Sequence, residues 1–303
     1  MVLTIGTDCS GIEAPIQAIK QLHLPFIHKW ACEIDKYARQ SILANYAPEI
    51  LYEDITKRDV KKLPNIDLYI CGFPCQPFSL IGNKQGVYDK RSNIMLHCID
   101  VIKVKKPTIF ILENVKNFRY IQDGIPFNYL LKQLNKLKTY SIVVNIMNTK
   151  DYGIPQNRDR LYIIGINKDK QIKDYVTPSK QTPPPLDDFI LDENVYNNKP
   201  CLNARRIIKR TNLNVSDNNI IACSGYGNYM KNMSPTITCT TKLYLTKYKR
   251  NLSLKEKLLL QGFPSDFQQV VSDSQFSKQI GNSMSVNVIK AVLKELLKCV
   301  NLN

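Results

Sequence analysis

The stretch IDLYICGFPCQPFS, residues 66–79, joins a short apolar run to a loop rich in proline. Its first part, IDLYIC (66–71), is almost wholly apolar and is followed by Gly72, a pattern typical of a strand buried on both faces of a parallel sheet. A second run of this kind, TIFILE, occupies residues 108–113. Parallel strands need crossover connections, so we expect helices between such runs.

The chain around these two runs alternates in the same way. Further apolar strands are expected at 2–7 and 26–33, and helical periodicity is found at 13–22, 35–46 and 92–105. This alternation predicts an α/β fold, a doubly wound and mostly parallel sheet with helices on both faces. The runs at 140–149 and 160–166 are predicted to be neighbouring strands at the sheet edge, and helices are expected at 252–261 and 285–298.

Composition changes after residue 167. Residues 168 to about 250 are loop-rich, polar and basic, with few clear periods. We therefore predict a first domain over 1–167, completed by a C-terminal helix at 280–303, and a second, smaller irregular domain over 168–279.

Charge and cysteine content narrow the function. The 303-residue chain carries a net charge of +16, which indicates a polyanionic partner such as nucleic acid; a solvated lysine-rich surface is the alternative. Nine cysteines and no export signal indicate a reducing compartment, and we expect a cytoplasmic protein of a bacterial, phage or virus-infected cell. The sequence contains no CxxC pair, so a structural zinc site is not expected. No apolar run reaches the roughly 18 residues that a membrane span needs.

Three conspicuous segments follow predicted strands: TDCSG (7–11), CGFPCQPFS (71–79) and ENV (113–115). Ligands of open parallel sheets bind beyond the carboxyl ends of the strands. We therefore expect a glycine turn, a cysteine and a glutamate to meet at one edge of the sheet.

Each of these residues has a functional and a structural interpretation. Gly11 and Glu33 suit a nucleotide-like group and its ribose, but a glycine turn also occurs in unrelated α/β proteins. Cys75, on a proline-held loop, suits a nucleophile, whereas Cys71 belongs to the core. Glu113, at the end of an apolar strand, suits a proton donor or a structural hydrogen bond.

The motifs resemble, in order, those of the DNA cytosine-C5 methyltransferases. The segments that carry the resemblance are DCSGIEA (8–14), CEIDKYA (32–38), EDI (53–55), GFPCQPFS (72–79), ENV (113–115), QNRDR (156–160), LQGFP (260–264) and QIGNSM (279–284). The resemblance implies a Rossmann-like, S-adenosylmethionine-dependent methyltransferase fold, double-stranded DNA as substrate, and target recognition by the small domain. It also implies a monomer, with a restriction endonuclease as a partner encoded elsewhere.

The resemblance assigns roles to individual residues. The catalytic residues are expected to be Cys75, Glu113, Arg158 and Arg160. The cofactor-binding residues are expected to be Cys9, Ser10, Gly11, Glu33, Ile34, Asp54, Ile55, Gly72, Pro74, Asn282 and Ser283. The DNA-binding residues are expected to be Ser79, Arg205, Arg206, Lys209, Arg210, Tyr226 and Thr236.

The chemistry of cytosine agrees with these roles. A thiolate that adds to C6 makes C5 reactive, which requires a soft nucleophile such as Cys75. Charge develops toward N3, so a proton donor such as Glu113 is needed there. Arg158 and Arg160 alternate along one strand and can bind the base carbonyl or a phosphate. The target atom is inaccessible inside a duplex, so the base must be flipped out.

The chain also departs from the family pattern. Cys9 stands where the family has an aromatic residue, Glu13 and Ala14 stand where Gly-Gly is common, and Leu259 replaces a common arginine. The alternatives are a tRNA cytosine methyltransferase, an inactive DNA-binding homologue and a dinucleotide oxidoreductase with a redox cysteine. The sequence Phe73-Pro74-Cys75 argues against the tRNA branch, which usually has Pro-Pro-Cys; the intact catalytic motifs argue against the inactive homologue.

Overall fold

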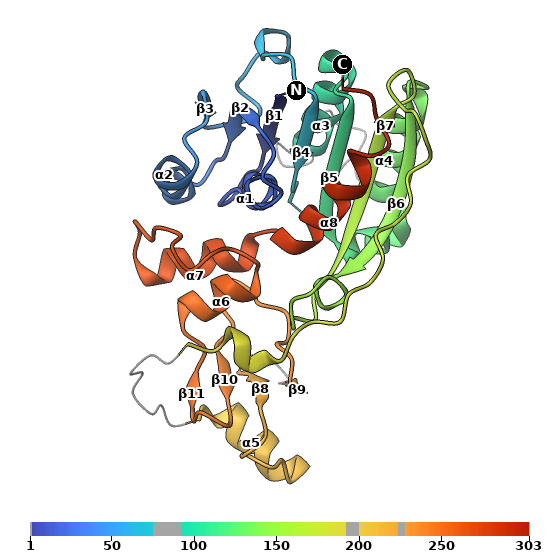
Figure 1. Ribbon diagram of the computed structural model, residues 1–303. Coiled ribbons are helices and arrows are strands. Elements are labelled where there is room, and N and C mark those ends of the chain that lie inside the picture. Colours follow the sequence, from blue (N-terminus) through green and yellow to red (C-terminus); the bar gives the residue numbers. More distant parts are fainter. Residues whose placement is uncertain (1, 75–92, 192–199, 224–227, 303) are drawn as a thin grey trace, which may run out of the picture. The chain divides into compact units, whose positions relative to one another are not determined.

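The computed structural model describes residues 2–74, 93–191, 200–223 and 228–302 (Figure 1). The chain forms two compact units. The first unit contains residues Met1–Met147, Asp159–Pro178 and Ile289–Asn303, and the second contains Asn148–Arg158 and Ser179–Val288. The chain therefore passes from the first unit to the second and back more than once.

A seven-stranded sheet in the order β3-β2-β1-β4-β5-β7-β6 forms the centre of the first unit. Its strands are β1 (Leu3–Asp8), β2 (Phe26–Cys32), β3 (Ile50–Tyr52), β4 (Leu68–Cys71), β5 (Ile109–Val115), β6 (Tyr140–Asn148) and β7 (Asp159–Asn167). The strands β1 to β5 pair in parallel, and β7 runs antiparallel to β5. The predicted α/β fold class is confirmed, and every residue of β4 is buried, as its apolar sequence predicts.

Helices connect these strands and cover the sheet. The helices of this unit are α1 (Ala14–Gln21), α2 (Lys36–Asn45), α3 (Asn93–Lys105), α4 (Ile125–Lys136) and most of α8 (Val286–Leu296). Figure 1 shows α1 and α8 in front of the sheet and α3 behind it. The sequence analysis did not single out α4, which buries Phe127, Leu130 and Leu134 at helical spacing.

The second unit contains a four-stranded antiparallel sheet in the order β11-β10-β8-β9. Its elements are α5 (Leu202–Thr211), β8 (Asn219–Ala222), β9 (Tyr229–Lys231), β10 (Leu243–Leu245), β11 (Arg250–Asn251), α6 (Leu254–Leu260) and α7 (Asp273–Asn282). Helix α5 packs Ala204 and Ile207 against Ile221 and Tyr244. This region is thus more regular than its sequence indicates, because strands of two to four residues are too short to show a period.

Short 3-10 turns complete the chain: η1 (Val60–Lys62), η3 (Lys116–Arg119), η4 (Ile121–Gly124), η5 (Thr149–Asp151) and η6 (Leu186–Phe189). No helix in the described part of the chain has both the length and the apolar character needed to cross a membrane.

Candidate functional site

The turn after β1 has an unusual backbone. Cys9 and Gly11 lie in the left-handed region, with φ of 50° and 57°. The Ser10 amide donates to the carbonyl of Cys32 at 3.2 Å, and the Gly11 amide donates to Glu33 Oε2 at 2.7 Å. Two consecutive amides of the turn are therefore fastened to the end of β2.

Glu33 is the acid that receives the Gly11 amide. Its Oε1 also accepts the Asp35 amide at 2.9 Å. Burial raises the pKa of Glu33, while the hydrogen bonds from Asp35 and Gly11 oppose that rise. A carboxylate oxygen can accept more than one hydrogen bond, so Glu33 keeps the capacity to bind hydroxyl groups. The next side chain, Ile34, is 70% exposed although it is apolar.

Asp54 lies two residues beyond β3, which pairs with β2. Its Oδ1 accepts the amide and the hydroxyl of Thr56 at 2.9 and 2.7 Å, and these bonds lower the pKa of the Asp54 carboxyl. Ile55 beside it is buried. Two adjacent strands of the first unit thus each present an oriented acid just past their carboxyl ends.

The chain that leaves β4 is held by a residue that the sequence analysis did not single out. Asn114 Nδ2 donates to the carbonyl of Phe73 at 3.0 Å, and the Phe73 ring packs edge-on against Phe118 at 5.2 Å between centroids. A buried amide at the end of an otherwise apolar strand was the available signal. Gly72 and Pro74 flank Phe73, and Cys71 lies in the core as predicted. The predicted residues Cys75, Ser79 and Tyr226 lie outside the described residues.

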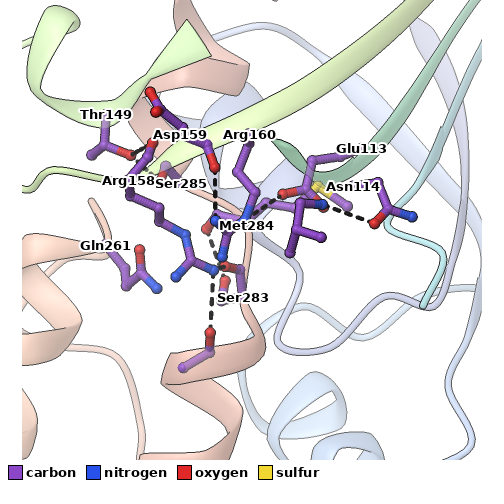
Figure 2. A network of polar contacts seen from close by, with 12 residues as sticks. Glu113, Asn114, Thr149, Arg158, Asp159, Arg160, Gln261, Ser283, Met284 and Ser285 are labelled. Atoms are coloured by element: carbon purple, nitrogen blue, oxygen red, sulfur yellow. Dashed lines mark hydrogen bonds and ion pairs between the residues drawn. The ribbon is translucent and has the colours of Figure 1, made fainter. Parts of the chain in front are cut away.

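Glu113 and Arg160 meet across two neighbouring strands (Figure 2). Glu113 on β5 is 8% exposed, and its Oε1 lies 3.2 Å from Arg160 Nε on β7. The antiparallel register pairs Val115 with Arg160, which brings the two side chains to the same sheet edge. Arg160 also donates to the carbonyl of Asp159. The carboxyl group therefore has a fixed orientation and a cationic partner.

Arg158 behaves differently from Arg160. Strand β7 begins at Asp159, so the two arginines do not alternate along one strand as the sequence suggested. Arg158 is 2% exposed, and its guanidinium donates to the carbonyls of Ile237, Gly281 and Ser283 at 2.7, 3.1 and 2.6 Å (Figure 2). These contacts all lie within the second unit and support a structural role. Its expected contact with the base or a phosphate stays a prediction.

Gln156 organises a segment of the second unit. Its Nε2 donates to the carbonyl of Leu260 at 2.7 Å, and its Oε1 accepts the Ile237 amide at 3.1 Å. Thr236, a predicted DNA contact, donates its hydroxyl to the carbonyl of Asn157 at 2.6 Å. Gln156, which was not assigned a role from sequence, thus fixes the extended stretch that carries Thr236.

The remaining predicted residues of the second unit fall into two groups. Asn282 ends α7 and accepts a hydrogen bond from Cys239 Sγ at 2.7 Å, while Ser283 beside it is buried. The other group is exposed on α5 and forms no ion pair with a carboxylate of the described residues: Arg205, Arg206, Lys209 and Arg210. The cofactor role of the first group and the DNA role of the second stay predictions.

Comparisons with known proteins bear on the family and the fold. The family described as C-5 cytosine-specific DNA methylase matches residues 7–298. The type II methyltransferase M.SsoII of Shigella sonnei is 36% identical over 287 residues, covering 88% of this chain and 73% of its own. M.NlaX of Neisseria lactamica is 32% identical over 279 residues, covering 88% and 87%. The structure of the Entamoeba histolytica methyltransferase EhMeth, 19% identical, superposes with a TM-score of 0.73 over 98% of both chains, which shows a shared fold.

Proposed function

The chain belongs to the C-5 cytosine-specific DNA methylase family and is thus a DNA (cytosine-5-)-methyltransferase, and we propose that it methylates C5 of a flipped-out cytosine through a covalent bond to Cys75. The observation that carries this proposal is the Glu113–Arg160 pair at the edge of the first sheet. The same unit contains the Asn114–Phe73 bond, which orients the backbone two residues before Cys75.

S-adenosylmethionine supplies the methyl group as an electrophile. The residues at the strand ends suit this cofactor: Glu33 has acceptor capacity for ribose hydroxyls, and the exposed Ile34 offers an apolar surface for a base. Asp54 is placed to accept an adenine amino group. We assign the cofactor to these residues, to Cys9, Ser10, Gly11, Ile55, Gly72 and Pro74, and to Asn282 and Ser283.

The proposed reaction divides the work among three side chains. The Cys75 thiolate adds to C6 of cytosine and makes C5 nucleophilic. Glu113 donates a proton to N3 or a hydrogen bond to it as negative charge develops there. Arg160 fixes the orientation of Glu113 and offers further donors to the base carbonyl. After methyl transfer a water molecule takes the C5 proton, and the electrons of that bond re-form the C5–C6 double bond while the Cys75 thiolate leaves C6.

The DNA is held by residues of the recognition domain, which we place at 168–279; the catalytic domain comprises 1–167 and 280–303. The exposed cations of α5 suit the DNA backbone, and Thr236 with Tyr226 and Ser79 suits the neighbourhood of the target base. A domain this small places few base-reading side chains, so we expect a target of about two to four base pairs. We expect the enzyme to act as a monomer, with a restriction endonuclease as its partner.

A trapping experiment tests the proposal. Duplex DNA that contains 5-fluorocytosine should form a denaturation-resistant adduct with the wild-type protein and S-adenosylmethionine, because the fluorine cannot leave as the C5 proton does. The adduct should be absent with Cys75→Ser, and Cys71→Ser is the matched control that should retain it. Adduct formation by Cys75→Ala, or a preference for tRNA over DNA, would contradict the proposal.

A further inference from the structure

Glu13 occupies an unexpected position in the turn that follows β1. It precedes α1 with φ 60° and ψ 47°, in the left-handed region, and its side chain is fully buried. Members of the C-5 cytosine-specific DNA methylase family commonly have glycine at this position, and glycine adopts such a conformation without strain. A non-glycine residue there is strained, so the surrounding contacts must compensate for the strain.

The Glu13 side chain turns back to β1. Its Oε1 lies 2.7 Å from Thr7 Oγ1, and the same hydroxyl lies 3.1 Å from His28 Nε2 on β2. Ser10 Oγ donates to Thr7 Oγ1 at 3.0 Å. The Glu13 amide meanwhile donates to the carbonyl of Ser10 at 2.9 Å. Glu13 is therefore bonded to the turn through its main chain and to the sheet through its side chain.

The Thr7 hydroxyl can complete its hydrogen bonds when Glu13 is a neutral acid, while the buried atoms Glu13 Oε2 and His28 Nδ1 have no hydrogen-bond partner among the described residues. A threonine hydroxyl has two lone pairs and one proton. Ser10 and a protonated Glu13 can fill the lone pairs of Thr7, which leaves the Thr7 proton for His28 Nε2. An ionised Glu13 accepts the Thr7 proton, and the lone pairs of Thr7 are then filled by Ser10 and by the Nε2–H tautomer of His28, so these hydrogen bonds form in either protonation state of Glu13.

The charges around the cluster favour the neutral acid form of Glu13. Burial, with the nearby Glu33 and Asp8 carboxylates, raises the pKa of Glu13 to about 8. His28 is no compensating cation, because burial lowers its pKa to about 4. The guanidinium of Arg58, in the same unit, is already paired with Asp8. Burial and the neighbouring carboxylates thus favour the neutral form of Glu13.

From this geometry we infer that Glu13 is a positioning residue for the cofactor: its side chain, bonded to Thr7 of β1, holds the turn of residues 9–13 in the backbone shape that presents the Ser10 and Gly11 amides to Cys32 and Glu33. The inference rests on the proposed cofactor role of Gly11 and Glu33. Cys9 and Glu13 have positive φ without being glycine, so the turn stores backbone strain that its bond to the sheet must offset.

Two substitutions separate this role from simple space filling. Glu13→Gln keeps an uncharged group that can donate to Thr7 and accept from it. Glu13→Gly removes the bond to Thr7 while relieving the backbone strain, so a residue that only fills space would be replaced by glycine without loss. Glu49→Gln, which changes a half-exposed carboxylate of the same unit, is the matched control.

The measurement is calorimetric binding of S-adenosylhomocysteine at pH 6.5 and pH 9. At pH 6.5, Glu13→Gln should bind within about threefold of wild type, and Glu13→Gly should bind about tenfold more weakly. Between the two pH values the wild-type Kd should rise about tenfold, because ionisation of Glu13 places a second buried negative charge close to Glu33 and strains the turn that Glu33 holds. Glu13→Gln should lack this rise, and Glu49→Gln should show it. The amino group of the ligand titrates alike against all four proteins.

Wild-type affinity in Glu13→Gly, or equal losses in Glu13→Gln and Glu13→Gly, would overturn the inference while leaving the proposed function intact. A wild-type protein that does not bind S-adenosylhomocysteine at either pH would overturn the cofactor proposal and this inference together. Thermal unfolding of each variant shows that the comparison is made between folded proteins.

Discussion

The carboxyl edge of the first sheet and the outer face of α5 both carry charged side chains, and they hold them in opposite ways. Glu113 and Arg160 are largely buried and bonded to each other across two strands. Arg205 and Arg206 on α5 are exposed and make no ion pair with a described carboxylate. Chemistry at one atom requires preorganised groups, whereas a polyanion is bound by charges that remain hydrated until it arrives.

This contrast predicts that substitution effects follow burial. The largest effect is expected for Glu113→Gln, which removes the acidic proton from an oriented site. The single-turnover methylation rate should fall about 10² to 10⁴-fold, the usual range for general acid catalysis. Affinity for S-adenosylhomocysteine should change little. A rate equal to that of wild type, or of the control Glu49→Gln, would remove Glu113 from the mechanism.

Arg158→Lys tests whether the loss of stability on replacing an arginine follows the burial of that arginine. A lysine ammonium cannot reach all three carbonyls that Arg158 binds, so buried acceptors are left without donors. The free energy of unfolding should fall by roughly 3 kcal/mol, measured by denaturant titration. Arg206→Lys, at an exposed position on α5, should change it by less than about 0.5 kcal/mol. Equal effects of the two changes would break the comparison.

The buried cluster of Glu13 and His28 gives the first unit a pH signature. Between pH 6.5 and 8 the folded protein keeps most of a proton on Glu13 that the unfolded chain has released, whereas His28 is neutral in the folded protein and loses its remaining charge in the unfolded chain. Raising the pH over this range therefore favours unfolding, by about 1 kcal/mol. Between pH 4.5 and 6.5 the effects of the two groups on stability offset each other. In this range the unfolded chain binds a proton on His28 and none on Glu13, whereas the folded protein binds one on Glu13 and none on His28.

Glu13→Gln should remove the loss of stability above pH 6.5, and it should reveal a rise of stability between pH 4.5 and 6.5 that belongs to His28 and that Glu13 cancels in the wild type. Urea unfolding at half-unit pH steps measures both limbs. A wild-type protein whose stability is constant from pH 6.5 to 8 would show that Glu13 is ionised in the folded state.

The smallest effect per residue is expected on α5. Arg205→Ala with Arg206→Ala should weaken DNA binding on all sequences alike and leave the methylated motif unchanged. The slope of log affinity against log salt should drop by about 0.9 for each DNA phosphate that the variant no longer neutralises. Lys132→Ala with Lys136→Ala, on α4 of the other unit, is the matched control. A changed methylation motif would instead identify α5 as a base-reading element.

The sequence by itself determined the parallel sheet and the family, and it predicted a site at the strand ends. Apolar runs and helical periods record which residues of one short element are buried, and the motifs at 72–79 and 113–115 stand directly after such elements. That is why the predicted strands and helices of the first unit agree with the structure to within a few residues. The second unit shows no comparable sequence pattern. Its strands are too short to give a period, and the amphipathic helix α5 is enclosed by polar loops.

Only the tertiary structure decided what the individual polar side chains contact. Arg158 and Arg160 are indistinguishable in the QNRDR motif, yet one binds carbonyls of residues 237, 281 and 283 and the other binds Glu113. Glu13 appeared in the sequence only as a departure from glycine, and its meaning came from Thr7 and from His28 on the next strand. Hydrogen bonds depend on distance and direction between chain segments that periodicity does not place, so a residue's type determines its chemistry and the fold chooses its partner.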